Sequence, residues 1–220
     1  MLAAAAARNN ADWCDLFCRT HGISGRFGRD FWSSPSRTPP LYSDAITLRP
    51  GVDAGLLMAA TDAGPGCSVK DSFAELDLEP YGLGVLFRAD WLQLARPGAA
   101  PVGWSAVIDK AELAEWERAW GERGEFFRPS LLGAAGFRML ARRGRDGQIV
   151  AGAIASQTGR VAGLTNLFGE DLEEVWAGAA AAARSAFHVE TVVGYSYGDS
   201  LTAARAAGFE PAGELTVWIS

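Results

Sequence analysis

Lys and Arg do not form a long basic stripe in this sequence. Lys and Arg number 20 against 26 Asp and Glu, which gives a formal net charge of −6 at pH 7. Binding along a nucleic-acid duplex needs a stripe of cations that neutralises phosphates. The missing stripe and the acidic balance therefore predict that nucleic acid is not a partner.

Long apolar runs and an export signal are lacking as well. No stretch approaches the roughly 18 apolar residues that indicate a membrane span, so no membrane partner is expected. The apolar residues 1–7 are too few for a signal peptide and follow no basic segment. Cys14, Cys18 and Cys67 are the three cysteines, and this odd number without an export signal predicts reduced thiols. We expect a cytoplasmic protein.

Cysteine and histidine, which hold zinc in structural sites, are also scarce, with three Cys and two His. Cys14, Cys18 and His21 are spaced i, i+4 and i+7, so they share one side of a predicted helix and could donate to Zn²⁺. The alternative is that the two thiols are small buried groups beside Trp13 and Phe17. Because dedicated zinc sites usually complete their ligand set with a second short pair, which this sequence lacks, no metal is expected.

Apolar residues for a buried core are plentiful. The chain has 220 residues, 49% of them hydrophobic, enough for one large domain or two small ones. Residues 1–43 combine a predicted helix at residues 10–21 with an arm rich in Gly and Pro. The many aromatic residues of this arm predict that it is ordered. After this arm the patterns predict a strand and a helix, two strands that pair as a hairpin, and a helix with Asp109 as its N-cap; the ranges are 45–48, 52–60, 67–78, 84–94 and 109–120.

The second half has a regular succession of elements. Three strands separated by turn residues predict an antiparallel meander, and two helices alternate with two further strands after it. The ranges are 137–142, 148–156, 161–168, 171–187, 190–195, 201–207 and 209–219. This order predicts an α/β (α+β) fold with a mixed, mostly antiparallel sheet flanked by helices.

The tail TVVGYSYGDSLTAARAAGFEPAGELTVWIS ends with a strand, a short helix, the pair Gly208-Phe209 and a last strand. This order resembles the end of the GNAT acetyltransferase superfamily. The segment IVAGAIASQTGRVAGLTNLF is similar to the two strands that precede the cofactor-binding helix in that superfamily. The resemblance covers residues 137–220. It suggests a GNAT-like domain over residues 44–220, with residues 67–130 as an elaborated insertion.

The resemblance implies that acetyl-CoA or another acyl-CoA binds after the strand 161–168. In the superfamily, backbone N–H groups of a glycine-rich loop and the following helix hold the pyrophosphate of the cofactor. The corresponding residues here are Asn166, Leu167, Phe168 and Gly169. This loop is degenerate, because it has one glycine and is followed by four carboxylates that repel a diphosphate: Glu170, Asp171, Glu173 and Glu174.

Two tyrosines are the best candidates for catalysis. Tyr195 and Tyr197 share one face of an extended segment at the carboxyl end of a strand, where open α/β sheets bind ligands. The superfamily often uses a tyrosine to protonate the departing thiolate; Ala204 stands in that place here, so the role would pass to Tyr195 or Tyr197. Amphipathic packing explains the pair equally well. Asp90, inside an aromatic strand, is the candidate general base, with a bound water as the alternative.

Two functions follow from these residues. The first is a GNAT-like acyltransferase that moves an acyl group from a CoA-type thioester to an amine or another small-molecule substrate. The second is a catalytically degenerate domain that keeps the sheet and binds a small ligand or a protein partner. Eight tryptophans fit either an aromatic pocket for an organic substrate or anchors of the core and of a homodimer interface.

Overall fold

The chain forms two compact units. The computed structural model describes residues 2–95, 102–121 and 126–220. The first unit comprises residues 1–91 with 212–220, and the second comprises residues 92–211. The division after residue 43 stays a prediction, and residues 96–101 and 122–125 of the suggested insertion lie outside the described residues.

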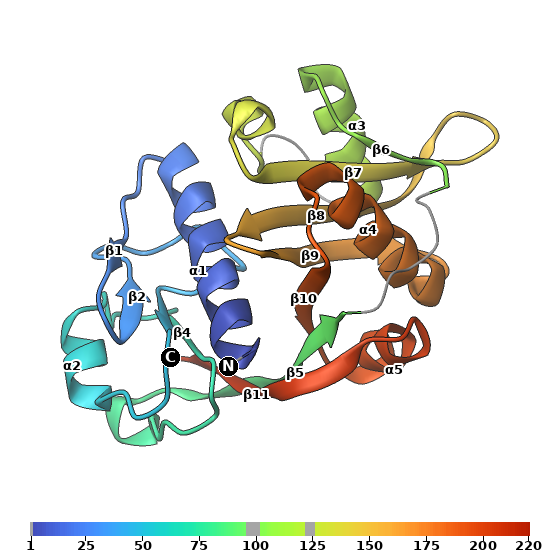
Figure 1. Cartoon of the computed structure of the whole chain (residues 1–220). Coiled ribbons are helices and arrows are strands. Elements are labelled where there is room, and N and C mark those ends of the chain that lie inside the picture. The colour runs from blue at the N-terminus through green and yellow to red at the C-terminus, as the bar shows by residue number, and fades with distance from the viewer. Residues whose placement is uncertain (1, 96–101, 122–125) are drawn as a thin grey trace. The chain divides into compact units, whose positions relative to one another are not determined.

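The first unit contains a mixed sheet (Figure 1). Its strand order is β1-β2-β3-β4-β11-β5, with β3 parallel to β4 and β11 antiparallel to β4. Its helices and strands are α1 (Leu2–Thr20), β1 (Arg26–Phe27), β2 (Phe31–Ser33), β3 (Ala45–Thr47), α2 (Ala54–Ala59), β4 (Ser68–Asp71), the 3-10 helix η1 (Glu79–Tyr81), β5 (Gly84–Leu94) and β11 (Glu210–Ile219). Strands β5 and β11 both continue into the second unit.

The predicted hairpin between β4 and β5 is wrong. Strand β11 lies between them, and β4 ends at Asp71 instead of continuing to Leu78. The cause is local, because the Asp71 carboxylate accepts hydrogen bonds from the N–H groups of Phe73 and Leu76, 3.3 and 2.7 Å away. Such side-chain bonds give the backbone an alternative to a strand ladder. Burial raises the pKa of this carboxyl above its usual value.

Helix α1 anchors the aromatic arm. It begins at Leu2, earlier than predicted, because its alanine-rich start favours a helix. The ring of Tyr42 stacks on Phe17 with centroids 3.9 Å apart, and Nε1 of Trp32 donates to the buried Asp15 at 3.0 Å. The residues after α1 are thus tied to the core of the unit, as expected from their aromatic content.

The His21 ring packs against Phe17 in a tilted arrangement, with ring centroids 4.7 Å apart. Within residues 2–95, 102–121 and 126–220, no group of three or more His, Cys, Asp or Glu side chains is placed to hold a metal ion. Cys14 and Cys18 are buried free thiols.

The second unit carries the predicted meander. Its strand order is β5-β10-β9-β8-β7-β6, antiparallel from β9 to β6, with β10 parallel to β9. Its other elements are β6 (Trp104–Ala106), α3 (Lys110–Trp120), the 3-10 helix η2 (Pro129–Gly133), β7 (Phe137–Arg143), β8 (Ile149–Thr158), β9 (Val161–Gly169), α4 (Leu172–Phe187), β10 (Thr191–Ser196) and α5 (Gly198–Ala206). The predicted α/β class with a mostly antiparallel sheet flanked by helices is confirmed.

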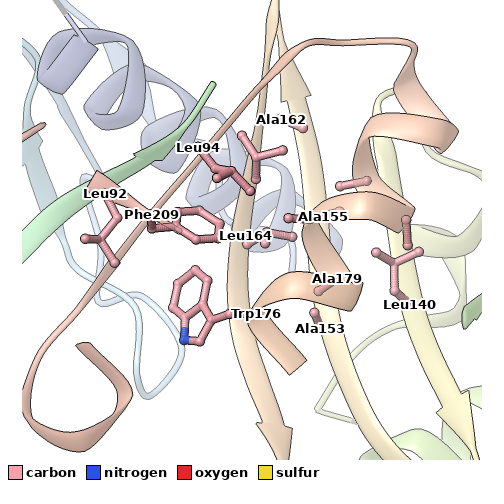
Figure 2. Packing of buried hydrophobic residues seen from close by; sticks show 14 of the residues in the cluster. Leu92, Leu94, Leu140, Ala153, Ala155, Ala162, Leu164, Trp176, Ala179 and Phe209 are labelled. Atoms are coloured by element: carbon pink, nitrogen blue, oxygen red, sulfur yellow. The ribbon is translucent and has the colours of Figure 1, made fainter. Parts of the chain in front are cut away.

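Helices α3 and α4 cover opposite faces of this sheet. Gly152 of β8 lies against Trp116 of α3, whereas its neighbour Ala153 belongs to the apolar cluster that includes Ala179 of α4. Consecutive strand residues point to opposite faces, so the two helices are separated by the sheet. Figure 2 shows the α4 side of this core.

Helix α3 begins at a side-chain cap. The Asp109 carboxylate accepts from the N–H groups of Ala111 and Glu112, at 2.8 and 2.9 Å, and so begins α3 where predicted. Helix α5 has Tyr197 as its N-cap, so the tyrosine stands directly before the helix. No helix among the described residues is long and apolar enough to cross a membrane.

Candidate functional site

Strands β9 and β10 separate after a short pairing. They are parallel and in register at three positions, Thr191 with Val161, Val192 with Ala162 and Val193 with Gly163. Both strands continue past these pairs, β9 to Gly169 and β10 to Ser196. An extended ligand that carries its own amide groups could pair with the edges beyond the last pair.

A β-bulge shapes the same part of β9 on its other edge. Thr165 is opposite Ile154 and Phe168 is opposite Gly152, so two residues of β9, Asn166 and Leu167, face a single residue of β8. Asn166 has a left-handed backbone with φ of 52°, a conformation that asparagine tolerates better than most residues. Its Oδ1 accepts from the Thr165 hydroxyl at 3.0 Å. Bulges redirect a strand and are frequent beside functional sites.

Phe168 is held directly after the bulge. Its ring meets that of Trp116 edge-on, with centroids 5.0 Å apart. A Cβ at Gly152 would lie 2.6 Å from Cζ of Phe168 and would also overlap Trp116. The missing side chain of Gly152 therefore makes room for both rings and keeps the end of β9 against β8.

Gly169 connects β9 to α4 through a tight turn. Its φ is 147°, and a Cβ there would lie 2.7 Å from Val175 and 2.9 Å from Ala151. Only glycine fits this position. The turn brings the end of β9 to the first turn of α4, whose N–H groups lack intrahelical partners.

Carboxylates surround this helix start. Asp171 is the N-cap and accepts from the N–H of Glu174 at 3.1 Å, so one first-turn donor is already engaged. The Glu174 carboxylate is itself paired with Arg142 at 3.0 Å. Glu170 and Glu173 are exposed. Two of the four charges thus have partners within the fold, and the helix start stays acidic.

Both predicted catalytic tyrosines follow the last pair between β9 and β10. Tyr195 is half-buried on β10, and Tyr197 is 54% exposed. The structure therefore places Tyr195 on β10, the strand beside residues 166–169 of β9, and Tyr197 directly after β10, all within one unit. Asp90 is half-buried on β5 and belongs to the first unit.

Trp176 is one of the eight tryptophans and was not singled out from the sequence. This indole of α4 is 1% exposed, and its Nε1 donates to the Ser200 hydroxyl at 3.2 Å. Its ring lies against Gly194 of β10 and meets Phe209 edge-on at 4.9 Å (Figure 2). A glycine within an apolar strand, which often marks a close approach of another group, was the available signal.

Solved structures share this arrangement. No family model and no curated protein matches the sequence. A GCN5-related N-acetyltransferase from Kribbella flavida aligns over 98% of this chain and 95% of its own, with a TM-score of 0.67 and 16% identity. A putative acetyltransferase from the GNAT family of Novosphingobium aromaticivorans aligns over 97% and 98%, with a TM-score of 0.60 and 17% identity. The chain has the GNAT fold.

The GNAT fold extends beyond the tail in which the sequence showed it. The resemblance rested on residues 137–220, whereas the structural alignment takes in almost the whole chain. The first half resembles these proteins in structure without carrying a motif that could be read from its residues. At identities of 16% and 17%, the likeness describes the fold.

Proposed function

We propose that this protein is an acyltransferase that moves an acyl group from a CoA-type thioester to an amine or another small metabolite. The observation that carries the proposal is the short parallel pairing of β9 and β10, which ends at Gly163 and Val193 beside the bulge at Asn166 and Leu167. The names of the two similar proteins, both acetyltransferases, support it.

The donor would lie along the edges of β9 and β10. The pantetheine arm of CoA is extended and bears amides, so it can pair with a strand edge as an added strand does. Its pyrophosphate would then lie near the start of α4, where N–H groups and the helix dipole attract an anion. Backbone N–H groups at the bulge would polarise the thioester carbonyl, as an oxyanion hole does.

The reaction needs two proton transfers. The acceptor nitrogen attacks the thioester carbonyl and loses its proton to a base, the proposed Asp90 or a bound water. The tetrahedral intermediate then collapses, the C–S bond breaks, and the leaving thiolate takes a proton from Tyr195 or Tyr197. The products are an amide and free CoA.

Binding of the donor tests the proposal most simply. A ligand that binds only the folded state at 100 times its Kd stabilises by about 2.7 kcal/mol. For a chain of this size each kcal/mol raises Tm by about 2 to 4 °C. CoA and acetyl-CoA should therefore raise Tm, and ATP at the same concentration controls for phosphate alone. An unchanged Tm at millimolar CoA would refute the proposed function.

The tyrosines are tested by turnover. Acetyl-CoA is supplied with a panel of amines, and CoA release is measured for Tyr195→Phe and Tyr197→Phe. Loss of a general acid should lower kcat by about 10²- to 10⁴-fold in one of them, with the Kd for CoA unchanged. Tyr81→Phe, at an exposed tyrosine of the first unit, is the control. If both variants turn over like the wild type, neither tyrosine is the acid.

A second candidate is a catalytically degenerate domain that binds a small ligand or a protein partner. The acidic start of α4 favours it, because exposed Glu170 and Glu173 repel a diphosphate. CoA that binds without any turnover over the amine panel would support a binding domain. Turnover with any amine would exclude it.

A further inference from the structure

Trp176 lies where strands β9 and β10 begin to separate. The last residues in register are Gly163 and Val193, and the next residues are Leu164 and Gly194. A Cβ added at Gly194 would lie 3.1 Å from Cη2 and Cζ3 of the indole and 3.3 Å from the Leu164 carbonyl oxygen. The ring therefore covers this point on the α4 face of the sheet.

Contacts on several sides hold the indole. Its Nε1 donates to Ser200 at the start of α5, the ring of Phe209 meets it edge-on, and the backbone of Gly194 lies directly against it. A buried side chain packed in this way moves only at a cost, because protein interiors are as dense as organic crystals. Figure 2 shows the indole beside Phe209 in the core of the unit.

We propose that Trp176 determines specificity by limiting the length of the acyl group. This inference rests on the proposed function. If the pyrophosphate lies at the start of α4, where the strands are already separate, the arm runs towards the residues where they come together. The acyl group at its far end then approaches Leu164, Gly194 and Trp176. An acetyl or propionyl group stops short of the indole, and a longer chain has to displace it.

Binding across acyl lengths tests this role. The wild type should bind acetyl-CoA at least about tenfold more tightly than hexanoyl-CoA, since even one misfitting methylene in an apolar pocket costs about 10- to 200-fold. Trp176→Leu should remove this preference while the Kd for free CoA stays the same. Trp104→Leu is the matched control, because Trp104 of β6 packs against Gly178 of α4, the helix that also carries Trp176. It should keep the wild-type preference.

Gly194→Ala provides a second variant in case Trp176→Leu does not fold. Its added methyl stands 3.1 Å from the indole, so the limit should move to shorter chains in a series from acetyl- to hexanoyl-CoA.

The role of Trp176 would be overturned if the wild type bound both donors equally, or if the preference were unchanged in Trp176→Leu or Gly194→Ala. The proposed function would still stand in that case, provided that free CoA binds. Failure of free CoA to bind the wild type would overturn both.

Discussion

Replacing Gly152 by alanine should destabilise the second unit and impair the site together. The added Cβ would lie 2.6 Å from Cζ of Phe168 and would overlap Trp116, whereas carbon atoms pack at about 3.5 to 4.0 Å. The rings must move by about 1 Å to restore this spacing. Overpacking of this kind costs about 1 to 3 kcal/mol.

The indole of Trp116 makes the change more costly. It is 0% exposed and donates to the Leu140 carbonyl oxygen at 2.9 Å. If the movement breaks this bond without replacement, a buried unsatisfied donor adds about 1 to 3 kcal/mol. At about 2 to 4 °C per kcal/mol, a thermal melt of Gly152→Ala should show a clear fall in Tm.

The site should respond as well, because Phe168 directly follows the bulge. A displacement of about 1 Å at the donor site can lower turnover by about 100-fold. Gly133→Ala is the control, since no atom lies within 4 Å of its added Cβ; its stability should change by at most about 0.5 kcal/mol. If Gly152→Ala melts like Gly133→Ala and turns over like the wild type, Phe168 and Trp116 do not hold the bulge in place.

Two further predictions concern charge and the buried thiols. Glu173→Gln should tighten binding of CoA by roughly two- to fivefold, as expected for one charge at a helix start, measured by titration calorimetry at low salt. Glu190→Gln is the control, because Glu190 lies beyond the other end of α4, and it should leave the affinity unchanged. Equal effects in both variants would contradict the electrostatic argument. Burial raises the pKa of Cys14 to about 11 and that of Cys18 to about 12, from a usual value of 9.0. The folded state therefore keeps protons that the unfolded state loses, so stability should fall as the pH rises from about 9 towards 12 in urea denaturation. The Cys14→Ala, Cys18→Ala double variant should show a smaller fall, and an unchanged pH dependence would refute this origin.

Elements with local signals could be predicted from the sequence. The start of α3 followed from Asp109, the meander from turn residues between its strands, and α4 from its apolar pattern after Asp171. The pairing of β4 with β11 could not be predicted, because β11 comes from the other end of the chain and neither sequence indicates the other strand as its neighbour. Alternation predicts a strand and leaves its neighbour open.

The candidate site was predictable to a similar extent. Residues 166–169 were proposed from the resemblance to the GNAT cofactor loop, and the two tyrosines from their place at the carboxyl end of a strand. The bulge could not be predicted, because a change of register depends on the facing strand as well. Its only local sign was Asn166, a polar residue in an apolar strand. Trp176 was not singled out from the other tryptophans, because the glycine in β10 indicates a close approach without saying which side chain of another element makes it.

The acidic start of α4 and the separation of β9 from β10 are compatible if the donor is held mainly by its arm. Asp171 and Glu174 have partners within the fold, which leaves Glu170 and Glu173 to oppose the pyrophosphate. Their repulsion acts through solvent and is screened by salt. Salt does not screen the pairing of the arm with a strand edge or the apolar contacts near Trp176. Affinity in such a site would come from the pantetheine and the acyl group, so the length of the acyl group would weigh more than the phosphates in the choice of donor.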